Sequence, residues 1–273
     1  MPDASAAADW NVRSRQWVKT APEGASTNDT PNQELFAYAG IKAGDHVLDL
    51  ASGTGEPAIS IAVAVGDEGS VTATDATEPM LRAAAKRAAN MGLENISFRL
   101  CPMEDIDFEE GRFDAVTCRF GMMHAGDSLA GLKHARRVLK PGGRAAIMVH
   151  GPADMNTAWT TVYTVAPEFF RIDRGANIER HYRFSEDGAA AAVFTEAGFR
   201  NVEQKLTTGE VRHPADKAFW RGSLERGFSK EMAGLDAAEC DELDARLRDA
   251  FAGYIVGGEY VLASTSRLAR GTK

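Results

Sequence analysis

From about residue 46 to residue 149, short apolar runs alternate with longer segments whose apolar residues recur every three or four positions. Short apolar runs are typical of strands buried on both faces of a parallel sheet, and the longer spacing is that of an amphipathic helix. The pattern predicts strands over residues 46–50, 70–74, 96–100, 113–118 and 144–149, with helices over 57–65, 80–91 and 128–139 between them. Strands that alternate with helices indicate a parallel sheet with right-handed crossovers.

The alternation stops after His150. An aromatic-rich segment over residues 152–183 predicts helices that cover the sheet's pocket. A helix over 187–197 and a strand over 199–206 are expected next. A helical insertion over about 215–253 then precedes a last strand near 259–266, which is expected to be antiparallel at the sheet edge. We therefore expect an α/β, doubly wound, mostly parallel seven-stranded sheet of the Rossmann-like class with a helical cap. The expected parts are an N-terminal helical cover (1–43), a cofactor-binding core (44–150), a cap over the acceptor site (151–198), and further strands with a helical insertion (199–273).

Composition narrows the classes of partner. The 273 residues include 31 basic and 39 acidic ones, giving a formal charge of −8, which disfavours a nucleic-acid-binding surface. No apolar run approaches the ~20 residues that span a bilayer, and no signal peptide is visible, so we expect a cytoplasmic protein without a membrane partner. The three cysteines lie far apart without metal-ligand spacing, so no metal site is predicted. The oligomeric state stays open, with a homodimer as one possibility.

The segment Val47–Pro57 carries the most specific chemistry. A strand ends near Asp49, passes through Gly53 and Gly55, and enters a helix, which is the arrangement of a nucleotide-type pocket. The spacing Gly53-x-Gly55-x-x-Ala58, with Asp75 20 residues beyond Gly55, also fits a dinucleotide fingerprint. Both NAD and S-adenosylmethionine have an adenosine ribose that a carboxylate can bind. A negative charge at Asp49 suits a sulfonium cation better than a pyrophosphate.

Four motifs in order resemble those of class I S-adenosylmethionine-dependent methyltransferases. The similarity is greatest to ubiquinone/menaquinone C-methyltransferases and to small-molecule natural-product methyltransferases, and it covers about residues 40–149. The motifs are residues 47–57, residues 73–81, residues 113–121, and residues 137–143. The resemblance implies S-adenosylmethionine as cofactor and a small-molecule acceptor, and it leaves the acceptor atom open.

The resemblance also implies roles for individual residues. The methionine end of the cofactor would be lined by Asp49, Ala51, Gly53, Thr54 and Gly55. The ribose hydroxyls would bind Asp75, and the adenosine would lie beside Ala76 and Met80. The adenine would be flanked by Met103 and Glu104, and the pocket would be closed by Arg119 and Phe120. One departure is Pro102, which offers neither a side-chain acceptor nor a backbone N–H where the family often has an acid or amide.

Simpler structural roles stand beside these. Asp75 could be a turn acid, Asp49 a loop cap, and Arg119 the partner of a neighbouring carboxylate rather than of an acidic acceptor. His124 and His150 each follow a strand and could accept a proton from the acceptor, or could be structural histidines.

Three functions are weighed. The first is methyl transfer by in-line displacement to an O, N or C atom of a small, partly apolar molecule. The others are an NAD(P)-dependent oxidoreductase and a non-catalytic cofactor-binding protein of the same fold.

Overall fold

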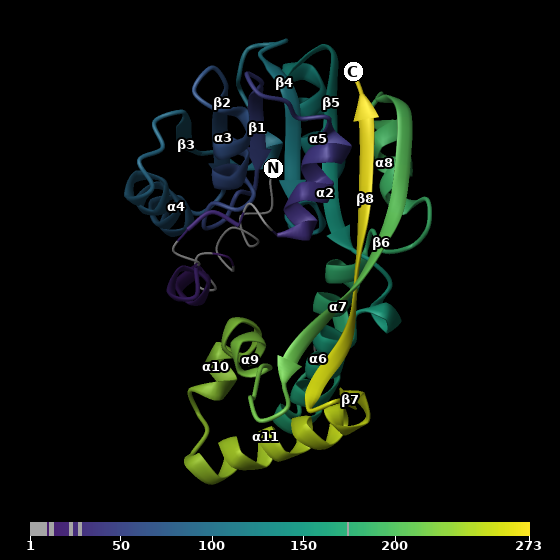
Figure 1. Ribbon diagram of the computed structural model, residues 1–273. Coiled ribbons are helices and arrows are strands. Elements are labelled where there is room, and N and C mark those ends of the chain that lie inside the picture. Colours follow the sequence, from purple (N-terminus) through teal and green to yellow (C-terminus); the bar gives the residue numbers. More distant parts are fainter. Residues whose placement is uncertain (1–9, 11–13, 22–23, 27–28, 174) are drawn as a thin grey trace. The chain divides into compact units, whose positions relative to one another are not determined.

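The computed structural model describes residues 10, 14–21, 24–26, 29–173 and 175–273. The central sheet has the strand order β3-β2-β1-β4-β5-β8-β6, with the short β7 paired to β8 (Figure 1). The strands are β1 (His46–Leu50), β2 (Ser70–Asp75), β3 (Ile96–Leu100), β4 (Phe113–Arg119), β5 (Leu139–His150), β6 (Arg200–Pro214), β7 (Ile255–Val256) and β8 (Glu259–Thr272).

The first five strands are parallel to one another. Figure 1 shows the arrow of β8 running opposite to those of β5 and β6, as expected for the last strand. The path of seven strands confirms the predicted mostly parallel, Rossmann-like sheet, and β7 is an addition to it. Because the chain moves outward from β1 to β3 and returns at β4, the strand order reverses between β1 and β4. That reversal is where ligands bind in folds of this kind.

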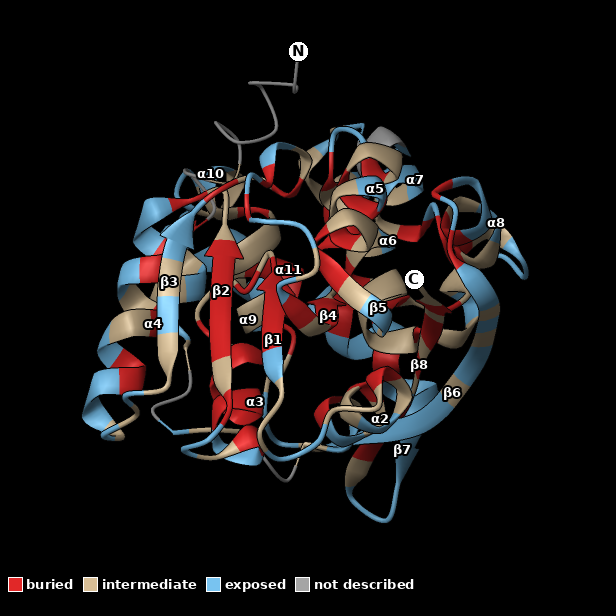
Figure 2. Ribbon diagram, turned by 90° about the horizontal axis from the view of Figure 1, so that it is seen from above, coloured by how far each residue is buried: buried red, intermediate tan, exposed pale blue. Residues whose placement is uncertain are grey.

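Helices cover the first five strands. α3 packs on β1 and β2, α4 on β2 and β3, α2 on β4, and α5 against α8. Figure 2 shows that β1 and β2 are almost entirely buried, whereas the edge strand β6 is largely exposed. This burial explains why the strands at the centre of the sheet have apolar sequences. These helices are α2 (Thr30–Ala39), α3 (Ala58–Val65), α4 (Glu78–Asn90), α5 (Ser128–Val138) and α8 (Ala189–Glu196), with the short turns η1 (Met103–Asp105) and η2 (Met122–His124).

The segment Lys140-Pro141-Gly142-Gly143, which precedes the strand expected over 144–149, lies within the bounds of β5. Leu139 pairs with Phe113, and pairing resumes only at Arg144 opposite Ala115, so the four residues between them form an irregularity in the strand. Lys140 Nζ donates to both oxygens of Asp114, at 2.7 and 2.8 Å, which fixes this irregularity against β4.

The chain divides into two compact units. Unit 1 comprises residues 1–149, 187–205 and 267–273, and unit 2 comprises 150–186 and 206–266. These limits differ from the expected ranges 151–198 and 199–273, because α8 packs on α5 in unit 1 whereas the helical insertion packs on α6 in unit 2.

Unit 2 has an apolar core of its own, centred on side chains with no exposed surface such as Trp220, Phe228, Leu247 and Tyr260. Trp220 Nε1 donates to the buried Asp244 at 2.8 Å, which satisfies both groups. The helices of this unit are α6 (Thr157–Phe170), α7 (Gly175–Tyr182), α9 (Arg221–Gly227), α10 (Ser229–Met232) and α11 (Ala237–Phe251), with the turns η3 (Ala153–Met155) and η4 (Ala252–Tyr254).

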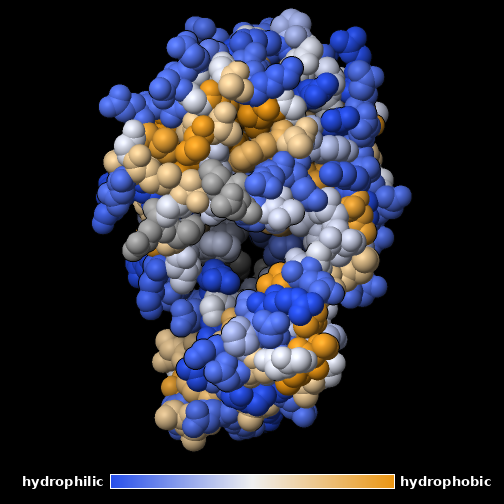
Figure 3. All heavy atoms as spheres, viewed as in Figure 1, coloured by the Kyte–Doolittle hydropathy of each residue, from blue (hydrophilic) through white to orange (hydrophobic). Residues whose placement is uncertain are grey.

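Hydrophilic residues dominate the face drawn in Figure 3, with smaller hydrophobic areas between them. None of the helices among the described residues is long and apolar enough to cross a membrane.

Candidate active site

A glycine-rich turn connects β1 to α3. Ala51 has a left-handed backbone with φ of 52°, and Gly53 and Gly55 also have positive φ, at 54° and 109°. A Cβ on Gly55 would lie 2.6 Å from Ile59 Cδ1, the flexible end of that side chain, and the φ of 109° is itself strained for any residue other than glycine. A Cβ on Gly53 would meet no described atom within 4 Å, so the backbone at Gly53 borders open space. A ligand can approach the chain closely at that residue.

Asp49 lies one residue before the end of β1 and has no exposed surface. Its Oδ1 accepts a hydrogen bond of 2.6 Å from Thr117 Oγ1 on β4, and its Oδ2 has no hydrogen-bond partner among the described residues. Burial raises the pKa of Asp49 to about 8, outweighing the opposing effect of the Thr117 hydroxyl. A buried carboxyl group with an unused oxygen is costly unless a cation or donor joins it.

Asp75 ends β2 and organises the neighbouring loop. Its Oδ2 accepts from Gly53 N at 2.9 Å, and its Oδ1 accepts from the backbone N–H and the hydroxyl of Thr77, at 2.8 and 2.6 Å. Burial raises the pKa of Asp75 although these hydrogen bonds oppose the shift. Within the part of the chain that the structure describes, the hydrogen-bond donors to Asp49 and Asp75 are all neutral groups.

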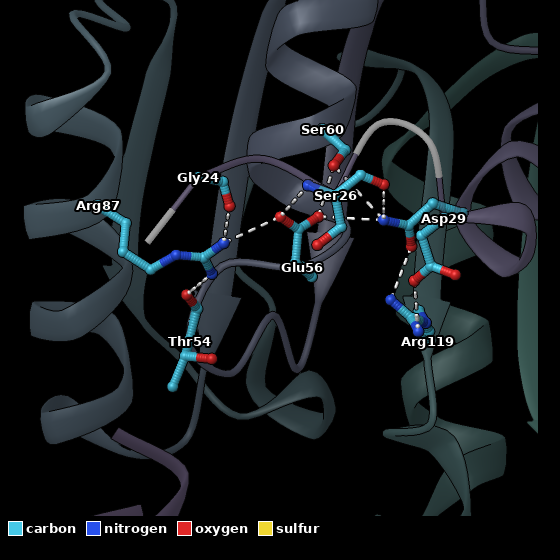
Figure 4. Close-up of polar contacts among 9 residues, drawn as sticks. Gly24, Ser26, Asp29, Thr54, Glu56, Ser60, Arg87 and Arg119 are labelled. Atoms are coloured by element: carbon cyan, nitrogen blue, oxygen red, sulfur yellow. Dashed lines mark hydrogen bonds and ion pairs between the residues drawn. The ribbon is translucent and has the colours of Figure 1, made fainter. Parts of the chain in front are cut away.

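Figure 4 shows how two arginines near the turn are engaged. Arg87 donates to Thr54 O in the turn and forms a 3.0 Å ion pair with Glu56. Arg119 pairs with Asp29 at 3.0 Å and donates to Asn32 Oδ1 at 2.8 Å. Two partners were considered for Arg119, an acidic acceptor and a neighbouring carboxylate of this chain. The structure shows a neighbouring carboxylate, that of Asp29, paired with Arg119.

The remaining expected cofactor residues have varied surroundings. Met80 is buried in the first turns of α4, and Ala76 N donates to Asp75. Met103 is buried, and a Cβ on Gly131 of α5 would lie 3.1 Å from it. These residues follow the ends of β2 and β3.

Glu104 accepts at Oε1 from the backbone N–H groups of Gly126 and Asp127, at 2.8 and 3.3 Å. Phe120 has a φ of 53° and packs against the buried cluster that contains Leu35 and Met148. Glu104 thus helps to hold the loop before α5, while Phe120 packs toward α2.

The two histidines fall in different units. His124 lies in η2, directly after β4, and the ring of Trp10 meets its ring edge-on with centroids 5.0 Å apart. His150 begins unit 2 and stacks on His181 at 4.0 Å. Burial lowers the pKa of His150 to about 4, so its imidazole is neutral at pH 7.

The family model of the ubiE/COQ5 methyltransferase family matches residues 32–215. The chain belongs to the ubiE/COQ5 methyltransferase family. It is accordingly a class I S-adenosylmethionine-dependent methyltransferase with S-adenosylmethionine as its cofactor, as the four sequence motifs predicted. Membership excludes the NAD(P)-dependent oxidoreductase weighed above.

Relatives of this methyltransferase carry quinone-related names. The ubiquinone/menaquinone biosynthesis C-methyltransferase of Cupriavidus necator is 40% identical over 191 residues, covering 64% of this chain and 76% of the relative. The demethylmenaquinone methyltransferase of Staphylococcus aureus is 31% identical over 183 residues, covering 63% and 75%. The match to the Bdellovibrio bacteriovorus C-methyltransferase is 37% identical over 123 residues, covering 45% of this chain and 52% of the relative, so the chain spans about half that relative's length.

Solved structures share the fold. The YcgJ protein of Bacillus subtilis aligns with a TM-score of 0.57 at 22% identity, covering 89% of this chain and 97% of that one. The [4+2]-cyclase SpnF aligns with a TM-score of 0.52 at 18% identity, covering 89% and 80%. The fold is therefore shared with a protein that is named for a cyclisation, and the acceptor must be argued from the family and the site.

Sequence reasoning missed Glu56, Arg87 and Asn32 of this methyltransferase as a connected group. A usable signal existed for Arg87, which lies on the same face of α4 as the buried Ala84 and Ala88. An arginine within an apolar helix face needs a buried partner. The sequence alone does not name that partner, because Glu56 lies 31 residues away.

Proposed function

We propose that this protein transfers the methyl group of S-adenosylmethionine to a carbon atom of a small, partly apolar aromatic molecule of the quinol type. The acceptor class is supported by the relatives, whose names specify quinone biosynthesis and C-methylation. An electron-rich ring carbon beside a hydroxyl group is a nucleophile of the kind that this cofactor methylates.

The surroundings of Asp49 carry the proposal. Its Oδ2 is buried without a partner, Gly53 borders open space, and Asp75 adds a second carboxyl group near the turn. Because Arg87 and Arg119 are each paired with a carboxylate of this chain, neither leaves an uncompensated positive charge there. A positively charged ligand is favoured at such a turn, because it gives the ionised form of Asp49 a partner of opposite charge.

The residues present fit S-adenosylmethionine. Asp49 would face its positively charged end, Gly53 and Gly55 would let it approach the backbone, and Asp75 would accept hydrogen bonds from the ribose hydroxyls. When bound, the cofactor supplies a methyl group on a positively charged sulfur. The protein's task is to hold this group and the acceptor in line and to exclude water, which can contribute roughly 7–11 kcal/mol.

A proton acceptor is needed because the acceptor's hydroxyl must ionise to activate the ring carbon. His124 is our candidate, since it follows β4 in the same unit as the glycine-rich turn and an imidazole nitrogen can take up that proton. His150 is a second candidate. Its low pKa keeps it neutral but makes it a weak base.

The test is a direct one. Purified protein is titrated calorimetrically with S-adenosylhomocysteine and, as a control, with NADH. It is then incubated with methyl-deuterated S-adenosylmethionine and a panel of hydroquinones, catechols and amines, and products are located by mass spectrometry and NMR. We expect the protein to bind S-adenosylhomocysteine but not NADH. We expect the deuterated methyl group on a ring carbon of a hydroquinone. A label on oxygen or nitrogen would overturn the assignment of a ring carbon as the methylated atom, and binding without turnover on any acceptor would favour the non-catalytic alternative.

His124→Ala tests the proton acceptor. We expect its turnover to fall by about 10²-fold or more, the usual contribution of a general base, with the affinity for S-adenosylhomocysteine unchanged. The measurement is kcat against pH for both proteins, with calorimetry for affinity. An identical pH profile in the variant would remove His124 as the base, and the same assay on His150→Ala then tests the second candidate.

A further inference from the structure

Asp49 and Thr117 lie opposite each other on β1 and β4, the two strands between which the strand order reverses. On the other side of β1, the register partner of Asp49 is Ala73 of β2. Residues paired in register on neighbouring strands direct their side chains to the same face of the sheet. Of the two register partners, only Thr117 has a polar side chain that can reach the carboxyl group of Asp49.

The contact between these two side chains is short and enclosed. Thr117 Oγ1 donates to Asp49 Oδ1 at 2.6 Å, and neither residue has any exposed surface. Water cannot substitute for a hydrogen bond in such a place, so the contact limits rotation of the carboxyl group. Oδ1 is held by β4, and Oδ2 remains without a hydrogen-bond partner among the described residues.

The charged groups around Asp49 act on it in opposite directions. Burial is the largest cause of its raised pKa, and the hydrogen bond from Thr117 opposes burial most. Glu56 of the turn and Asp75 of β2 raise that pKa further, and Arg119 of β4 lowers it. The helix α3, which also packs on β1, has no titratable residue. Thr117 therefore makes the largest contribution that favours the ionised form.

The two remaining titratable groups of β4 do not take over this role. Burial raises the pKa of Cys118, so its thiol is neutral at pH 7 and supplies no positive charge. Asp114 lies near the start of β4, where both of its oxygens accept from Lys140 Nζ.

We propose that Thr117 is a positioning residue, whose hydroxyl group orients the carboxyl group of Asp49 so that Oδ2 is left for the positively charged end of S-adenosylmethionine. This inference rests on the proposed function, since it concerns the same cofactor. Thr117 acts through Asp49, to which its hydroxyl is committed. Without that hydroxyl the carboxyl group can rotate, and its ionised form loses a hydrogen bond that stabilises it.

The loss of the hydroxyl has two effects on binding, and they differ in their dependence on pH. Loss of orientation weakens binding at every pH. Loss of the hydrogen bond raises the pKa of Asp49, which weakens binding further where the carboxyl group must ionise as the ligand binds, below about pH 8. A threonine that only packs within the sheet would not produce this dependence on pH.

The test compares Thr117→Val with the unmodified protein, because valine keeps the branched shape and lacks the hydroxyl group. Affinity for S-adenosylmethionine is measured calorimetrically from about pH 6.5 to about pH 9.5. The ratio of the two affinities at each pH cancels any titration of the ligand itself. We expect the variant to bind about ten-fold more weakly, or worse, at the lowest pH, and the loss to shrink several-fold toward the highest pH.

Thr74→Val is the matched control. Thr74 of β2 also has no exposed surface, and its Oγ1 donates to the backbone oxygen of Asp49 at 3.2 Å. The substitution removes a buried hydroxyl bonded to the same residue but not to its carboxyl group, so any loss of affinity should be the same at every pH. Thr117→Ser keeps the hydroxyl and should restore the unmodified pH profile. If Thr117→Val fails to fold, Thr117→Ala takes its place.

The outcomes separate the two proposals. If the unmodified protein does not bind S-adenosylmethionine, the proposed function fails. If it binds, and the folded Thr117→Val variant loses no affinity or loses the same factor at every pH, the positioning role is overturned and the proposed function stands. A profile of Thr117→Ser that matches that of Thr117→Val would also overturn it, because the hydroxyl group would then not be the cause.

Discussion

At the scale of single residues, Asp49 combines two properties that oppose each other. Its position on the central strand buries it completely, and its Oδ2 has no partner among the described residues. Burial therefore favours the protonated form and raises the pKa to about 8. The group is costly for stability, and this cost fits our proposal that it binds a cation.

Asp49→Asn tests this conflict without cofactor. The raised pKa means that the folded protein keeps the proton between about pH 4 and pH 8 whereas the unfolded chain loses it, so stability is fully present below pH 4 and declines as the pH rises toward 8. The uncharged substitute lacks this decline. We expect the variant to be more stable by ~2–4 kcal/mol at pH 8 and by little at pH 4, measured by urea unfolding at both values.

The same substitution should weaken cofactor binding. Because a positive ligand needs Asp49 ionised, its affinity for the unmodified protein should fall with decreasing pH below 8, by up to about ten-fold per unit. The variant should bind more weakly and with little pH dependence. Parallel stability and binding profiles for the two proteins would contradict the assignment of the pKa to Asp49.

At the scale of elements, the turn after β1 depends on a contact with the loop after β4. A Cβ on Gly121 would lie 2.5 Å from Ala51 Cβ and 2.9 Å from Cys118 Sγ. The alanine at position 51, which has a left-handed backbone, is accommodated because position 121 has no side chain. The two loops that border the candidate site can therefore pack closely, because the side chain at position 51 is small and position 121 has none.

Gly121→Ala should destabilise the protein by ~1–3 kcal/mol through overpacking. Adding Ala51→Gly should recover part of that loss, since it removes one of the two close contacts and relieves the backbone at position 51. Urea unfolding of both single variants and the double variant measures the coupling. Gly253→Ala is the control, because a Cβ there would meet no described atom within 4 Å; additive effects of the pair would contradict the proposed contact.

At the scale of the whole molecule, the residues of the glycine-rich turn and the two arginines beside it, Arg87 and Arg119, all belong to unit 1. Unit 2 is built on a separate apolar core in which Leu247 has no exposed surface. A substitution in the apolar core of unit 2 therefore leaves the side chains of the glycine-rich turn unchanged.

Leu247→Ala should lower the stability of unit 2 by ~2–5 kcal/mol through loss of apolar contact and the cavity left behind. Because no residue of the glycine-rich turn lies in unit 2, we expect the affinity for S-adenosylhomocysteine at low temperature to be retained, whereas turnover falls. Calorimetry and an activity assay on one preparation measure both. Loss of cofactor affinity in the folded variant would show that unit 2 helps to hold the donor.

Sequence pattern alone determined the alternation of strands and helices through β5, because apolar runs of strand length are visible without knowledge of their partners. It also marked Asp49 and Asp75 as neighbours, since the carboxyl ends of adjacent parallel strands meet at one sheet edge. The family's motifs identified the cofactor. The roles of Asp49, Asp75, His124 and the other site residues stay predictions.

Only the tertiary structure decided which charges pair. Glu56, Arg87 and Ser26 lie far apart in the sequence, and each can face water in the unfolded chain. Folding brings them into hydrogen-bonding contact, where their polar groups bind one another instead of water. The same holds for the division after residue 150, where α8 returns to the first unit and the helical insertion joins α6. Local periodicity records which face of an element is buried, but the identity of the element that buries it depends on contacts between distant segments, which no local pattern encodes.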